Sequence, residues 1–78
     1  MTIAEWVAKR IISLCKERNI SINKLATLSG VTQSTLNSII HGESKNPRLG
    51  TIRKISEALG ISTAEFFRDF EKAKIEDE

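Results

Sequence analysis

The chain has 78 residues, of which 28% are charged, a net charge of +2 and a single cysteine, Cys15. This length fits one domain, one cysteine excludes an internal disulfide, and no Cys/His cluster offers a metal site. No apolar run approaches membrane-spanning length and the first residues lack a signal-peptide pattern, so we expect a reduced cytoplasmic protein that does not contact a membrane.

The first predicted helix covers residues 3–18. Thr2 and Glu5 have the spacing of a capping box, in which each side chain accepts a hydrogen bond from the backbone of the other residue. The apolar residues that follow recur at helical spacing, which predicts one face directed to the core. That face consists of Ile3, Val7, Ile11, Leu14 and Cys15.

Two shorter helices are predicted next. Ser21 can cap the first of them, and Gly30 closes it because glycine readily adopts a left-handed conformation. The residues that this helix directs to the core are Leu25, Ala26 and Leu28. After a very short turn, Thr32 can cap a helix that continues through residue 40 and ends at His41 and Gly42.

The remainder of the chain contains a loop and two more helices. Residues 43–47 are polar and end in a proline, which favours a loop. A fourth helix follows, with an apolar stripe formed by Leu49, Ile52, Ile55 and Leu59. Gly60 stops it, and Ser62 with Glu65 has the spacing of a second capping box. The fifth helix carries Phe66, Phe67 and Phe70.

The whole pattern predicts an all-α fold. It contains five helices, no strand pattern and no repeat, and we expect one domain over residues 1–70. Residues 71–78 are rich in charge and form a predicted flexible tail.

The helix over residues 33–40 divides into two faces on a wheel of 100° per residue. One face is apolar except for Thr35, and the other consists of short, neutral, hydrogen-bonding side chains: Gln33, Ser34, Asn37, Ser38 and His41. An ordinary solvated face more often carries Lys and Glu, whereas amide and hydroxyl groups are suited to the edges of DNA bases. The pattern alone is compatible with either interpretation.

The segment ISINKLATLSGVTQSTLNSIIHG at residues 20–42 resembles the helix-turn-helix of the lambda-repressor-like, Xre-type transcriptional regulators. The resemblance continues through NPRLGTIRKISEALGISTAEFF and covers residues 10–67. It implies a compact five-helix domain of prokaryotic or phage origin, acting in the cytoplasm at the nucleoid. Such a domain binds double-stranded DNA as a homodimer on a palindromic operator, often as a repressor, with its third helix in the major groove.

The resemblance assigns base contacts to Gln33 and Ser34 at the start of the third helix, and to Asn37 and Ser38 one turn later. It assigns contacts with the DNA backbone to the residues around that helix, namely Ser21, Thr32, His41, Lys45 and Arg48. Helix capping explains Thr32 equally well, and His41 is also explained by the helix dipole. Lys45 and Arg48 are either phosphate contacts or plain surface charge, although residues 1–50 carry seven basic side chains against three acidic ones.

Three features depart from the family pattern. Many members have a phosphate-binding glutamine where this chain has Ile22. The third helix also has no Arg or Lys that could bind guanine. This second departure favours contacts with A·T base pairs or recognition of DNA shape. Members also commonly pair an Arg in the first helix with a Glu in the third, and the matching residues here are Cys15 and Ile40. Because both are apolar, we expect Cys15 to be buried against Ile40 as a small hydrophobic residue.

The surface of a homodimer is less defined by the sequence. Trp6 lies outside the core face of the first helix and Phe70 extends the stripe of the fifth, so both are candidates for the interface. Scattered apolar residues on the surface explain them equally well.

Two other classes of function compete with DNA binding. One is a protein-binding module, such as an antitoxin. The other is an enzyme, which the single histidine and the lack of a phosphate-binding loop or paired carboxylates argue against. No cofactor and no small-molecule effector are expected.

Overall fold

The first helix, α1 (Ile3–Glu17), begins at the capping box that the sequence predicts. The Thr2 hydroxyl accepts a hydrogen bond from the Glu5 N–H, and the Glu5 carboxylate accepts one from the Thr2 N–H at 2.7 Å. The helix ends at Arg18, whose backbone N–H donates to the carbonyl of Leu14. Its predicted core face is buried from Val7 to Cys15, whereas Ile3 is exposed at the first turn.

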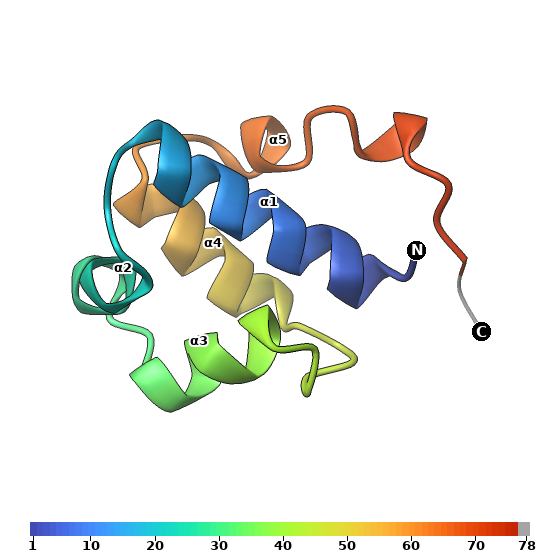
Figure 1. Ribbon diagram of the computed structural model, residues 1–78. Helices are drawn as coiled ribbons and strands as arrows, with labels where there is room; N and C mark the ends of the chain where they lie inside the picture. Colours follow the sequence, from blue (N-terminus) through green and yellow to red (C-terminus); the bar gives the residue numbers. More distant parts are fainter. Residues whose placement is uncertain (77–78) are drawn as a thin grey trace.

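The computed structural model describes residues 1–76, and these residues form helices and loops without a strand (Figure 1). The helices that follow α1 are α2 (Ile22–Ser29), α3 (Gln33–Ile40), α4 (Leu49–Ala58) and α5 (Thr63–Phe66). A single 3-10 turn, η1 (Phe70–Lys72), comes after them. None of the described helices is long and apolar enough to cross a membrane. The predicted all-α fold of five helices is therefore confirmed.

One hydrophobic core joins the helices. α3 packs against α1 and α2, and α4 packs against α2 and α5. The core takes Val7, Ile11, Leu14 and Cys15 from α1, Leu25 and Ala26 from α2, Leu36 and Ile39 from α3, Ile52 and Ile55 from α4, and Phe66 from α5. Figure 1 shows α3 along one edge of the molecule, with α1 between it and the α5–η1 segment.

Two leucines that the sequence placed in the core lie outside it. Leu28 near the end of α2 is 50% exposed, and Leu49 at the start of α4 is 64% exposed. Both predictions were wrong for the same reason. A helical wheel continues an apolar stripe to the ends of a helix, but the neighbouring helices cover only its central turns.

The fifth helix is shorter than predicted. α5 ends at Phe66, with Phe67 as its C-cap residue, and Asp69 then adopts a left-handed backbone at φ 68°. The Ser62 hydroxyl accepts from the Glu65 N–H as expected. The Glu65 carboxylate lies 3.3 Å from Arg68 and 3.9 Å from Arg10. Phe70 begins η1 and is separated from the helix by the turn at Asp69.

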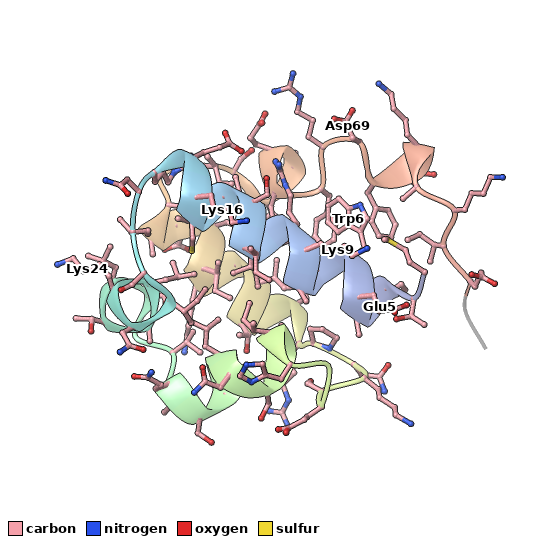
Figure 2. All side chains as sticks on the ribbon, in the orientation of Figure 1. Glu5, Trp6, Lys9, Lys16, Lys24 and Asp69 are labelled. Atoms are coloured by element: carbon pink, nitrogen blue, oxygen red, sulfur yellow. The ribbon has the colours of Figure 1, made fainter. Side chains whose placement is uncertain are left out.

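Aromatic contacts hold the segment after α5 against α1. The Trp6 ring stacks on Phe67 at a centroid distance of 5.7 Å and meets Phe70 edge-on at 4.9 Å. Figure 2 shows Trp6 on the side of α1 that faces this segment. The Glu76 N–H donates to the Met1 carbonyl at 2.8 Å. The flexibility predicted for 71–78 stays a prediction, and its last two residues lie outside the described residues.

Two arginines of α1 connect the helix to carbonyl groups elsewhere in the fold. The Arg10 guanidinium donates to the carbonyls of Glu65 and Phe66, both at 2.7 Å. The Arg18 guanidinium donates to the carbonyl of Leu59 at 3.2 Å. Since the last carbonyls of a helix have no partner within it, these bonds satisfy acceptors at the ends of α5 and α4.

Candidate nucleic-acid interface

The turn between α2 and α3 sets the angle at which α3 leaves the core. Gly30 has a φ of 71° and donates its N–H to the carbonyl of Ala26, which closes α2. Val31 is buried beside the turn, and the Thr32 hydroxyl accepts a hydrogen bond from the Thr35 N–H at 3.2 Å. The chain thus ends one helix and begins the next within three residues, because glycine permits a backbone that other residues avoid.

α3 keeps its apolar side in the core and its polar side outward. Leu36 and Ile39 are buried and Ile40 is half-buried against the core. On the other side Gln33 and Ser34 are exposed. The helix therefore presents a row of amide and hydroxyl groups along the edge of the molecule seen in Figure 1.

The second pair of predicted base contacts is more enclosed. Asn37 and Ser38 are half-buried, and the Ser38 hydroxyl donates to the Glu43 carboxylate at 3.4 Å. The Ser38 carbonyl also accepts the N–H groups of Glu43 and Ser44. The loop after α3 is thus folded back onto the last turn of the helix.

A shallow depression lies between α3 and this loop. Its lining is mostly polar and consists of Ser34, Thr35, Ser38, Ile39, Glu43, Ser44, Asn46, Pro47, Arg48 and Thr51. Thr35 is the polar residue here that the wheel placed on the apolar side. The structure exposes it, and its hydroxyl accepts from that of Thr32 at 2.8 Å.

The residues predicted to contact a DNA backbone surround α3. Ser21 caps α2 and is exposed, with its hydroxyl accepting from the Lys24 N–H at 3.0 Å. Thr32 caps α3 and His41 is its C-cap residue, and both are exposed. Thr32 and Ser21 therefore serve as helix caps, and their predicted phosphate contacts stay predictions.

Positive charge lies beside α3 and not on it. Lys45 and Arg48 are exposed in the loop before α4, and Lys24 projects from α2 (Figure 2). The ion pairs within residues 1–76 join α1, α4, α5, η1 and the chain ends, and none of them includes these three side chains. Their charges are available to an anionic partner. Within residues 1–76, no three histidine, cysteine, aspartate or glutamate side chains lie close enough together to hold a metal ion.

One side chain near α3 was missed by the sequence analysis. Asn23, the second residue of α2, is exposed, and its Oδ1 accepts a hydrogen bond from Nε2 of Gln33. A pattern along one helix does not show a contact between two helices. The feature of the sequence that could have indicated this contact is the short turn, since a short connection brings the starts of α2 and α3 within reach of each other.

The departures from the family pattern have different outcomes. Cys15 is buried in the core against which Ile40 packs, so the predicted burial is confirmed. Burial raises the pKa of the Cys15 thiol above its ordinary value. Ile22 is half-buried and packs against the core. Its side chain is a hydrocarbon and has no polar group that could bind a phosphate.

Trp6 and Phe70, the candidates for a dimer interface, meet each other within one chain. Both are half-buried by this contact and by Phe67. Their role between two copies of the chain stays a prediction.

Comparison with known proteins places these features in a family context. The helix-turn-helix family model matches residues 11–66. The chain is 37% identical over 57 residues to the HTH-type transcriptional repressor RghR of Bacillus subtilis, an alignment that covers 73% of this chain and 42% of that protein. The chain spans between 34% and 42% of the length of the curated relatives that it matches.

Solved structures show the same fold. The prophage Lp1 protein 11 superposes with a TM-score of 0.79 at 43% identity, over 86% of this chain and 88% of that one. A helix-turn-helix family transcriptional regulator from Vibrio cholerae gives 0.78 at 32% identity, over 88% of this chain and 38% of that one. The residues matched by the family model, 11–66, include the turn that orients α3.

Proposed function

The chain belongs to the helix-turn-helix family of transcriptional regulators, and on that premise we propose that it binds double-stranded DNA through α3 to regulate transcription. The observation that carries the proposal is the division of α3 into a buried apolar side and an outward row of amides and hydroxyls. These groups match the donors and acceptors on base edges in the major groove.

In this proposal, one set of residues provides sequence specificity and another set provides affinity for the DNA backbone. Gln33, Ser34, Asn37 and Ser38 contact base edges. Lys45 and Arg48, with His41 and the capping residues Ser21 and Thr32, contact the DNA backbone. Because α3 carries no charged side chain, sequence preference comes from neutral hydrogen bonds, and salt-dependent attraction comes from the flanking cations.

We further propose a homodimer on a palindromic operator, acting as a repressor at the nucleoid of a bacterial or phage-bearing cell. A single eight-residue helix buries little surface on DNA, and two-fold pairing is the usual means by which such domains gain affinity. The relative RghR is a repressor by name, which supports this direction of regulation. The proposal involves no cofactor and no catalytic step.

Fluorescence anisotropy with labelled DNA from upstream of the protein's own gene tests the proposal. Wild-type binding should weaken steeply as salt rises, because cation–phosphate contacts release counterions. Gln33→Ala should cost about 1–3 kcal/mol on the specific site and little on a scrambled duplex. Lys45→Ala, as the control, should weaken both duplexes equally and reduce the salt dependence.

Two results would contradict the proposal. Equal losses by Gln33→Ala on both duplexes would remove α3 from base recognition. A wild-type protein that binds no DNA even at low salt would favour the alternative, an antitoxin-like protein-binding module with the same fold. Sedimentation of the protein–duplex complex gives the number of chains on each site and tests the homodimer.

A further inference from the structure

Glu43 is the one acidic residue in the stretch 18–56, which carries six Lys and Arg residues. It comes just after α3 and lines the depression that Ser34 and Ser38 also line. Its side chain is exposed and forms no ion pair within residues 1–76. An unpaired negative charge therefore lies beside two of the proposed base-contacting residues, on a surface proposed to approach DNA.

The backbone holds Glu43 at the end of α3. Its N–H donates to the carbonyl of Ser38 at 2.9 Å, and the N–H of Ser44 donates to the same carbonyl at 3.1 Å. The side chain is not fixed in the same way, because its contact with the Ser38 hydroxyl is long for a hydrogen bond, at 3.4 Å. The main chain thus sets the place of Glu43, and the carboxylate can still turn toward a partner.

A carboxylate at this place weakens DNA binding unless it finds a hydrogen-bond donor. Like charges at an interface cost free energy, and an ionised carboxylate can only accept hydrogen bonds. The donors in the major groove are the N4 amino group of cytosine and the N6 amino group of adenine. Adenine also presents N7 as an acceptor, which repels a carboxylate, whereas cytosine presents no acceptor there. Cytosine is therefore the base that suits Glu43 best.

We propose that Glu43 recognises a cytosine in the major groove and lowers the affinity for sites that lack it. The inference rests on the proposed DNA binding through α3 and adds a specificity-determining residue to it. α3 itself carries no Arg or Lys that could bind guanine. Glu43 instead recognises a G·C pair through its cytosine, and on other duplexes its charge faces phosphates without a compensating donor.

The test begins with a pool of synthetic duplexes that have a randomised centre. Wild-type protein selects a preferred duplex, and anisotropy then measures its affinity for versions with each base pair changed. Glu43→Met has a similar length but neither charge nor acceptor. It should reduce the preference for cytosine at one position by about tenfold. It should also bind a scrambled duplex more tightly than wild type, because repulsion from the phosphates is removed.

Glu43→Gln separates the charge of this residue from its ability to accept a hydrogen bond. The amide keeps an acceptor oxygen, so this variant should lose less of the cytosine preference than Glu43→Met and gain as much affinity for the scrambled duplex. Glu17→Gln is the matched control, because Glu17 is exposed at the end of α1 and lies outside the depression. It changes the net charge equally and should leave the cytosine preference unchanged.

A modified base tests the contact from the DNA side. N4-methylcytosine still pairs with guanine, but a methyl group replaces the amino hydrogen that points into the major groove. At the position identified above, this base should weaken wild-type binding by about tenfold. It should have little effect on Glu43→Met, which has no carboxylate to accept that hydrogen.

The outcomes separate the two proposals. An equal gain in affinity by Glu43→Met on every duplex, with no loss of cytosine preference, would mean that Glu43 only repels phosphates and would overturn the inference. Equal wild-type affinity for cytosine and N4-methylcytosine would overturn it as well. A pool from which wild-type protein enriches no sequence would refute the proposed function itself. Urea unfolding should give the same stability for wild type and both Glu43 variants, since the side chain is exposed.

Discussion

Cys15 shows how the core changes the chemistry of one residue. The side chain is buried, and removal from water raises the pKa of its thiol above the ordinary value of 9.0, with Arg18 acting weakly in the opposite direction. The thiolate is the reactive form of cysteine. Here burial limits the access of reagents to the sulfur, and the raised pKa lowers the fraction of thiolate. The residue therefore serves packing.

We predict that the folded protein is slow to react at Cys15 and loses stability at high pH. Iodoacetamide should label it at pH 8 more than about tenfold more slowly than in urea, because reaction requires local opening. Folding raises the pKa, so the contribution of Cys15 to stability is complete below the unfolded pKa near 9.0 and is lost as pH rises through the folded value.

Urea unfolding at pH 8 and pH 10 measures the predicted loss of stability at high pH. Cys15→Val is the control because it cannot ionise, and its stability should fall less between the two pH values. Labelling of the native protein as fast as of the unfolded chain would show that Cys15 is accessible.

The start of α1 shows what a local signal contributes to a whole element. Thr2 and Glu5 bond each other's backbone N–H groups, which otherwise lack partners at a helix start. These hydrogen bonds hold the pKa of the Glu5 carboxyl below its ordinary value of 4.5. The charged form is therefore favoured in the folded state.

We predict that Thr2→Ala destabilises the protein by about 1 kcal/mol at neutral pH. Since folding lowers the pKa of Glu5, its contribution is complete above pH 4.5 and is lost as pH falls through the folded value. The difference between wild type and Glu5→Gln, which cannot ionise, should accordingly shrink below pH 4 as measured by urea unfolding, whereas the effect of Thr2→Ala should depend less on pH because the backbone N–H of residue 2 still donates to the Glu5 carboxylate. Ser13→Ala, an exposed position in the middle of α1, is the control and should not destabilise. A pH-independent difference between wild type and Glu5→Gln would contradict the bond from the Thr2 N–H to the Glu5 carboxylate.

Prediction from sequence succeeded where the signal was local to an element. The caps Thr2, Ser21, Thr32 and Ser62 all bond the backbone three residues later, as their spacing indicates. Leu28 and Leu49 were misplaced because burial depends on which neighbour covers a helix end. That information comes from tertiary packing and is absent from the periodicity of one helix.

The candidate site divides in the same way. The two faces of α3 followed from its wheel, since Leu36 and Ile39 must enter the core. The bond between Asn23 and Gln33 did not, because it joins side chains on two helices. The wheel also placed Thr35 on the apolar side, although the structure exposes it beside the depression.

At the scale of the whole molecule, Arg10 connects the first helix to the last. Its side chain is 17% exposed and donates to two carbonyls at the end of α5. These bonds complement the aromatic contacts of Trp6 and give the short α5 a fixed place on α1. A four-residue helix is too short to be stable by itself, so its position depends on such tertiary contacts.

We predict that Arg10→Met destabilises the protein by about 2 kcal/mol, since it leaves two carbonyls without their charged donor. Arg68→Met is the matched control, because Arg68 is exposed and pairs with the same Glu65, and it should change stability by less than about 0.5 kcal/mol. Urea unfolding followed by circular dichroism compares the two. Equal effects would mean that the carbonyl contacts of Arg10 contribute nothing beyond a surface ion pair.

The stacking of Trp6 on Phe67 and its edge contact with Phe70 also give the molecule an internal optical reporter. The chain has one tryptophan and no tyrosine, so ultraviolet emission comes almost entirely from this ring. The ring touches the segment after α5, on the other side of α1 from α3 (Figure 1). Its emission should therefore shift to longer wavelength when that segment undocks and should change little when α3 is occupied. One spectrum thus distinguishes release of the carboxyl-terminal segment from events at the opposite face.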